Sequence, residues 1–211
     1  MNKKITFVGM GPGAKECLTL EGLAHIRQSA NVLSSRRLYE LIKDENPKAQ
    51  FIELPSHTQE AFKVIEALKE QELTILVSGD VGLFSMAQSL KVLLVNCECR
   101  FLSGLSSVQV AFSRLGEEWS QNKVYSLHGR ELLITSDKLQ EEEVFTLLCG
   151  TREAQNQAQD IYEKLKDNFL AWGFVDLTLP SEKILSLHQI NLKEVQVYSR
   201  LLLIFKKRKQ V

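Results

Sequence analysis

A glycine-rich stretch, Gly9-Met10-Gly11-Pro12-Gly13, directly follows the first apolar segment of the chain, Ile5–Val8. Glycine tolerates positive φ and carries no Cβ, so a small ligand can lie against the main chain at such a loop. The run Gly9-x-Gly11-x-x-Ala14 also meets the permissive form of the dinucleotide-binding fingerprint. The stretch therefore predicts a loop that binds a nucleotide or nucleoside, with a purely structural turn as the alternative.

The spacing after this loop disfavours a nicotinamide dinucleotide. A dinucleotide loop runs straight into its helix, so that the first N–H groups of the helix face the pyrophosphate. Here the helical pattern covers Leu20–Ser29 and Thr19 is its expected N-cap, which leaves several residues between loop and helix. Pro12 also removes a donor from the loop. An NADP-dependent oxidoreductase, with Arg36 and Arg37 on the 2′-phosphate, remains an alternative.

Two more polar, glycine-containing loops follow predicted strands. Ser78-Gly79-Asp80-Val81-Gly82 comes after Leu73–Val77, and Ser103-Gly104-Leu105-Ser106-Ser107 comes after Arg100–Leu102. An open α/β sheet binds ligands outside the carboxyl ends of its strands, where all three loops would meet. An aspartate there suits ribose hydroxyls or a ligand ammonium, and serine hydroxyls suit polar ligand edges. Each loop taken singly also fits a turn or a helix N-cap.

The elements that position these loops alternate along residues 5–115. Short apolar strands are separated by helical patterns, which predicts a parallel sheet covered on both faces. The expected strands are Ile5–Val8, Asn31–Leu33, Phe51–Leu54, Leu73–Val77 and Arg100–Leu102. The expected helices are Leu20–Ser29, Arg37–Ile42, Thr58–Glu70, Phe84–Val95 and Ser106–Leu115.

The alternation stops at the polar stretch Gly116–Asn122, where we expect a boundary between domains 1–116 and 117–211. Beyond it, consecutive strands without intervening helices predict a mixed sheet with antiparallel pairs. The expected elements are strands Val124–Leu127 and Val144–Leu148, helix Glu153–Lys166, and strands near Leu170–Phe174, Ile184–His188 and Val197–Phe205.

Composition narrows the functional classes. The chain has 211 residues with 26 basic and 26 acidic side chains, and this balance disfavours nucleic acid as the main partner. Its apolar runs are too short to span a bilayer, so we expect no membrane association and a cytoplasmic protein. Cys97 and Cys99 lack a second Cys or His pair that would complete a zinc site, and we expect no protein-bound metal.

Four segments together resemble the tetrapyrrole methylase family. They are Gly9–Gly13 with Leu18-Thr19, Ser78-Gly79-Asp80, Ser103–Ser107 and Leu148-Cys149-Gly150. Within this family, Ser126-Leu127-His128-Gly129-Arg130 is similar to the branch that methylates ring carbon 5 of a precorrin. The resemblance covers nearly the whole chain. Val81, Ser103 and Ser34-Ser35 depart from the family pattern, which has proline at the first two positions and glycines at the third.

The resemblance implies a fold of two α/β domains, the first with a mostly parallel sheet and the second with a mixed sheet, with S-adenosylmethionine held in the cleft between them. It implies a homodimer that methylates a small-molecule corrinoid, and a separate carbon-15 methyltransferase/decarboxylase as a partner. The residues it assigns to the cofactor come from three loops and one second-domain strand: Pro12, Gly13, Gly79, Asp80, Leu83, Ser106, Ser107 and Cys149.

Methyl transfer from a sulfonium to a nucleophilic ring carbon mainly needs alignment, so a dedicated base is not obligatory. If a base removes the carbon-5 proton, His128 is the candidate, because its ordinary pKa lies near neutrality; a structural histidine is the alternative. Arginine suits the carboxylates of a corrinoid, and Arg37 and Arg130 are the substrate-binding candidates, while Arg36 and Arg114 also adjoin motif positions. Two further alternatives are another methylase of the family and a non-catalytic corrinoid or nucleoside binding protein.

Overall fold

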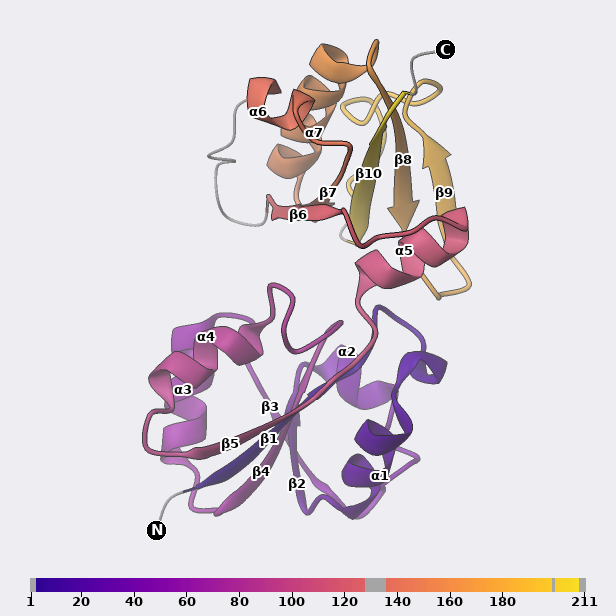
Figure 1. Ribbon diagram of the computed structural model, residues 1–211. Coiled ribbons are helices and arrows are strands. Elements are labelled where there is room, and N and C mark those ends of the chain that lie inside the picture. Colours follow the sequence, from indigo (N-terminus) through magenta and orange to yellow (C-terminus); the bar gives the residue numbers. More distant parts are fainter. Residues whose placement is uncertain (1–2, 128–135, 199, 209–211) are drawn as a thin grey trace. The chain divides into compact units, whose positions relative to one another are not determined.

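The computed structural model describes residues 3–127, 136–198 and 200–208, and the chain divides into two compact units, Met1–Ser106 and Ser107–Val211 (Figure 1). The division precedes helix α5 (Ser107–Leu115), whereas the boundary expected after Gly116 follows it, so the two assignments differ in which unit receives this helix. Among the described residues, no helix is both long and apolar enough to cross a membrane.

The first unit is built on a five-stranded sheet in which every strand pair is parallel, as predicted. Its strand order is β3-β2-β4-β1-β5. The strands are β1 (Lys4–Gly9), β2 (Asn31–Ser34), β3 (Gln50–Glu53), β4 (Glu72–Val77) and β5 (Glu98–Leu102).

Helices cover both faces of this sheet (Figure 1). They are the 3-10 turn η1 (Lys15–Cys17), α1 (Leu20–Gln28), α2 (Arg36–Glu40), α3 (Thr58–Ala67) and α4 (Met86–Leu93). Because side chains alternate along a strand, Phe7 faces the core under α3 and α4, while Val8 faces the core under α1 and α2. Both side chains are fully buried.

The start of α1 confirms the predicted cap. Thr19 Oγ1 accepts a hydrogen bond from the Gly22 N–H at 3.1 Å and donates its own proton to the Ser103 carbonyl at 3.2 Å. The same side chain thus satisfies an otherwise unpaired N–H of the helix and ties the helix to the third loop. Ser85 caps α4 in the same way, through the Ala87 N–H.

The second unit has a mixed sheet, which confirms the antiparallel pairs expected there. Its order is β6-β7-β10-β8-β9; β6 pairs with β7 in parallel, and the other pairs are antiparallel. The strands are β6 (Lys123–Ser126), β7 (Val144–Cys149), β8 (Phe169–Val175), β9 (Lys183–Ser186) and β10 (Leu201–Lys207), and α6 (Ser136–Gln140) and α7 (Arg152–Leu165) accompany α5. Together the two units give the α/β fold with two differently built sheets that the sequence predicts.

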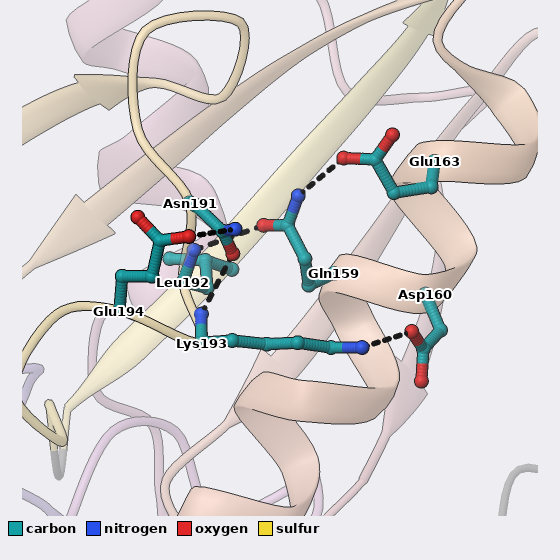
Figure 2. Close-up of polar contacts among 7 residues, drawn as sticks. All are labelled: Gln159, Asp160, Glu163, Asn191, Leu192, Lys193 and Glu194. Atoms are coloured by element: carbon teal, nitrogen blue, oxygen red, sulfur yellow. Dashed lines mark hydrogen bonds and ion pairs between the residues drawn. The ribbon is translucent and has the colours of Figure 1, made fainter.

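Helix α7 also holds the irregular segment between β9 and β10 (Figure 2). Buried Gln159 accepts the Leu192 N–H at 2.9 Å through its side-chain oxygen, and its amide nitrogen donates to Glu163 at 2.8 Å. One turn earlier, Gln155 accepts the Tyr198 N–H at 2.6 Å. Main-chain N–H groups that have no partner in a strand are therefore hydrogen-bonded to side chains of α7, which holds the segment that precedes β10 in place.

Candidate functional site

The first two glycine-containing loops lie at the topological switch point of the first sheet. Strands β1 and β4 are neighbours, but the chain leaves β1 toward β2 and leaves β4 toward β5, on opposite sides of the pair. Open α/β sheets bind ligands at such a point, outside the carboxyl ends of the strands. The strand order therefore puts these two loops where the fold favours a binding site.

The main chain joins these two loops directly. Gly11 and Gly79 form a bridge in which the Gly11 N–H donates to the Gly79 carbonyl at 3.2 Å and the Gly79 N–H donates to the Gly11 carbonyl at 2.9 Å. The Met10 N–H donates to the Val77 carbonyl at 2.8 Å. Gly11 and Gly79 have φ of +75° and +67°, conformations in which a side chain would be strained.

The third loop meets the first two through glycines that have no room for a side chain. A Cβ on Gly104 would lie 2.5 Å from the carbonyl oxygens of both Gly9 and Gly79, and one on Gly9 would lie 2.5 Å from the Gly104 nitrogen. All of these neighbours are backbone atoms, which cannot yield as a flexible side chain does. A Cβ on Gly79 would meet nothing within 4 Å. The three loops thus form one continuous main-chain surface.

The Asp80 side chain links the second loop to the third loop. Its Oδ1 accepts the Gly82 N–H at 2.7 Å within its own loop, and its Oδ2 accepts the Gly104 N–H of the third loop at 3.2 Å. Asp80 remains partly exposed. The observed role of Asp80 is to hold the second and third loops together. Because a carboxylate oxygen can accept more than one hydrogen bond, Asp80 can also contact a ligand, and that contact stays a prediction.

The other residues expected to contact a cofactor lie in or beside the same loops. Pro12 and Leu83 are partly exposed, whereas Gly13 and Ser106 are buried. Ser107 is the first residue of α5 and belongs to the second unit. The structure thus brings the predicted residues of the first unit to the carboxyl edge of one sheet, and their contacts with a ligand stay predictions.

In the second sheet, the carboxyl ends of three strands also lie at one edge. Strand β10 is antiparallel to both β7 and β8, and β6 is parallel to β7, so the carboxyl ends of β6, β7 and β8 point the same way. Cys149 ends β7 and is fully buried, and burial raises the pKa of its thiol well above the ordinary value. Because the whole residue is buried, a contact between Cys149 and a ligand stays a prediction. His128 and Arg130 follow β6 in the chain and lie outside the described residues.

A strained loop, which no sequence pattern predicted, lies at the carboxyl end of β8. Asp176 and Thr178 have φ of +50° and +69°, and this conformation is a marked outlier for a β-branched threonine. Glu182 holds Thr178 through its N–H at 2.6 Å and accepts from Arg114 at 2.8 Å. The arginine hydrogen bond is the main reason that the pKa of Glu182 lies below its ordinary value. A polar turn directly after a strand was the available signal.

The three described arginine candidates differ in their surroundings. Arg37 donates to the Ser78 hydroxyl at 2.5 Å, which brings its guanidinium to the second loop. Arg36 lies over the Phe51 ring, 5.0 Å from its centroid, and pairs with a glutamate, and Arg114 pairs with Glu182. Of these three, Arg37 is the one that the described contacts connect to the glycine loops.

Comparisons with known proteins add independent information. The family model for Tetrapyrrole (Corrin/Porphyrin) Methylases matches residues 4–190. A probable cobalt-precorrin-7 C(5)-methyltransferase of Methanocaldococcus jannaschii is 32% identical over 130 residues, 60% of this chain and 61% of the relative. A cobalt-factor III methyltransferase of Priestia megaterium is 27% identical over 128 residues, 55% of this chain and 24% of the relative. The matches thus span less than two thirds of these relatives.

Solved structures share the fold over almost the whole chain. A cobalt precorrin-4 methyltransferase superposes with a TM-score of 0.80 at 17% identity, covering 96% of this chain and 94% of the other. A precorrin-6Y methylase from Archaeoglobus fulgidus gives 0.73 at 21%, covering 98% and 99%. A uroporphyrin-III C-methyl transferase from Thermus thermophilus, complexed with S-adenosylhomocysteine, gives 0.76 at 17%, covering 96% and 97%.

Proposed function

The chain belongs to the tetrapyrrole methylase family, and from this premise we propose that it transfers a methyl group from S-adenosylmethionine to carbon 5 of (cobalt-)precorrin-7, giving (cobalt-)precorrin-8 in cobalamin biosynthesis. The family's members are S-adenosylmethionine-dependent C-methyltransferases. The similarity to a cobalt-precorrin-7 C(5)-methyltransferase supports the choice of ring position. We further propose that the protein acts in the cytoplasm as a homodimer and that a separate carbon-15 methyltransferase/decarboxylase is its partner.

The observation that carries the proposal is the main-chain surface made by Gly9, Gly79 and Gly104. Because Cβ atoms on Gly9 and Gly104 would collide with backbone, the three loops pack main chain against main chain at the switch point, with the main-chain groups of partly exposed Pro12 and Gly79 beside them. Such groups suit the polar edges of a nucleoside and the amino-acid part of S-adenosylmethionine. The Asp80 carboxylate beside them suits its ammonium group. The residues present therefore fit the cofactor.

When bound, S-adenosylmethionine supplies a methyl group activated on a sulfonium. The loops would hold the donor in one orientation, and alignment of the two reactants provides much of the rate enhancement in such a displacement. Arg37, together with Arg130, would bind substrate carboxylates and so set which ring carbon faces the methyl group. His128 would accept the carbon-5 proton. In this scheme the protein's main contribution is positioning.

The test combines binding and chemistry. Calorimetric titration with S-adenosylmethionine, S-adenosylhomocysteine and NADPH should show binding of the first two only. With cobalt-precorrin-7 as substrate, mass spectrometry should detect one added methyl group, and NMR with a ¹³C-labelled methyl donor should assign it to carbon 5. NADPH binding without S-adenosylmethionine binding would refute the cofactor, and methylation at another carbon would refute the ring position.

Neighbouring arginines provide a matched control for the substrate. Arg37→Ala should weaken corrinoid binding at least tenfold, which corresponds to about 1.4 kcal/mol, and leave S-adenosylhomocysteine affinity unchanged. Arg36→Ala, which removes a cation that faces Phe51, should change neither. Arg130→Ala should behave like Arg37→Ala, whereas His128→Ala should lower the rate at saturating substrate. Equal effects of the Arg36 and Arg37 substitutions would contradict the assigned role.

A further inference from the structure

Phe84, between the second loop and helix α4, has a backbone conformation that its local sequence does not explain. Its φ is +48°, and among the described residues the other non-glycine residues with positive φ are Asp176 and Thr178. A bulky side chain in this region is a strained outlier, and such strain persists where the surrounding structure enforces it and is concentrated at binding and catalytic sites.

The loop around Phe84 is fixed on both sides. Before it, Val81 is buried in the core and its carbonyl accepts from Gln88 at 2.9 Å. After it, the Ser85 side chain caps α4. Phe84 nevertheless stays 57% exposed. The chain therefore bears the strain of a left-handed phenylalanine without gaining the burial that normally accompanies an aromatic side chain in a core.

Two other exposed apolar side chains adjoin the glycine loops. Leu20, 86% exposed, follows Thr19, whose hydroxyl is bound to the third loop. Leu105, 40% exposed, follows Gly104, whose N–H binds Asp80 in the second loop. Exposed apolar groups on loops that contact one another favour the binding of something apolar there. Leu105 lies on the third loop, which is joined to the second loop by Asp80, four residues before Phe84.

The positive charge of Arg37 indicates which class of ligand binds beside these apolar residues. Arg37 is bound to Ser78, at the start of the second loop. The segment from Ser78 to Phe84 thus binds the Arg37 guanidinium, which suits a carboxylate, at one end and carries an exposed aromatic residue, which suits a flat apolar face, at the other. A tetrapyrrole-derived ring with carboxylate side chains has both features. S-adenosylmethionine has one carboxylate, on its amino-acid part, and its adenine ring offers a smaller flat face than the macrocycle does.

We propose that Phe84 is a substrate-recognition residue whose ring packs on the flat face of the corrinoid macrocycle. The inference rests on the proposed function for the substrate class, and it goes beyond it by assigning this contact to a residue that the sequence motifs did not single out. With this strained φ the residue stays exposed beside the second loop.

Cobyrinic acid, a stable corrinoid with free carboxylates, is the binding probe. Phe84→Ala should weaken its binding at least tenfold, while affinity for S-adenosylhomocysteine stays within twofold, and Phe84→Tyr should restore most of the corrinoid affinity. Val95→Ala is the matched control, because Val95 is an exposed apolar residue, 77% accessible, beyond the opposite end of α4. It should bind both ligands as the wild type does.

The backbone part of the inference has its own readout. Phe84→Gly and Phe84→Ala both remove the ring and differ only in tolerance of positive φ. The glycine variant should therefore melt about 2–4 °C above the alanine variant, although both bind cobyrinic acid equally weakly. A lower melting temperature for the glycine variant would overturn the claim of strain.

Three results would overturn the recognition role. They are wild-type corrinoid affinity in Phe84→Ala, an equal loss of S-adenosylhomocysteine affinity, which would assign the ring to the adenine, and a change of oligomeric state in sedimentation, which would assign it to an interface between copies. Failure of the proposed function looks different. In that case cobalt-precorrin-7 would not be methylated, although cobyrinic acid binding still depended on Phe84.

Discussion

Substitution of Gly104 by alanine tests whether the joined glycine loops form the cofactor site. A methyl group there would lie 2.5 Å from two carbonyl oxygens, of Gly9 and Gly79, where ordinary contacts begin at 3.4 Å. The atoms that would have to move belong to the main chain of two other loops. The third loop must therefore separate from the first two by about 1 Å.

The magnitude follows from that displacement. Inserting a methylene-sized group into closely packed structure typically costs about 1–3 kcal/mol of stability. A displacement of about 1 Å between positioning groups can also lower a catalysed rate by about 100-fold. We expect Gly104→Ala to remain folded, with a melting temperature lowered by several degrees, and to lose at least 100-fold in affinity for S-adenosylhomocysteine, measured by calorimetry.

Two glycines that lack close neighbours separate steric collision from backbone strain. Gly79 and Gly116 both have φ of +67° and would meet nothing within 4 Å as alanine, but only Gly79 lies in a glycine loop. Both alanine variants should lose a similar, small amount of stability, about 1 kcal/mol. Gly116→Ala should bind S-adenosylhomocysteine normally. Wild-type affinity in a folded Gly104→Ala variant would refute the assignment of these loops to the cofactor.

Three further predictions concern polar groups of the two units. Asp80→Asn replaces one acceptor oxygen with a donor that faces a main-chain N–H, so it should cost about 1–3 kcal/mol of stability and weaken S-adenosylhomocysteine binding, as measured by melting and calorimetry. Arg114 lowers the pKa of Glu182, a shift that stabilises the fold at pH values above the ordinary pKa of 4.5. Glu182→Gln should therefore reduce the free energy of unfolding at neutral pH, and denaturation measured at successively lower pH should show the difference from the wild type shrink as the pH falls through the lowered pKa. Burial and the raised pKa of Cys149 should protect it from iodoacetamide in the folded protein, while partly exposed Cys17 is modified, which peptide mass mapping can check.

Local pattern was sufficient to predict most of the elements, because a buried parallel strand reads as an unbroken apolar run and an amphipathic helix as a repeat of 3.6 residues. The predicted strand Leu73–Val77 lies within β4, and Thr19 is the observed cap of α1. The short helix α6 was not among the expected elements, since its five residues are too few for a period to show. Strand order was not predictable, because it depends on contacts between segments far apart in the chain.

The site was predicted to the level of loops and not of contacts. The common edge of the three loops follows from a parallel sheet, so sequence was enough to bring them together. The close approach of Gly9 to Gly104 joins residues far apart in the chain, and no local pattern encodes it. The strained backbone at Phe84 and Thr178 could not be predicted from the sequence either. Neither residue type favours positive φ, so nothing in the local sequence indicates that conformation there.

The departures from the family pattern are accommodated outside the glycine contacts. Val81 turns its side chain into the core of the first unit, where it is 6% exposed, and thereby fixes the second loop by burial where relatives have the ring of a proline. Ser103 is exposed and takes part through its carbonyl, which accepts from Thr19 and which any residue would supply. Ser34 is buried at the end of β2, and its hydroxyl donates to the Ser35 carbonyl at 3.0 Å. None of these side chains is among the nearest atoms to the positions where Cβ atoms of Gly9 and Gly104 would lie. Since the three loops contact one another through main chain, the shape of the surface that we assign to the cofactor depends on the glycines that touch and not on the side chains of Val81, Ser103 and Ser34 beside them.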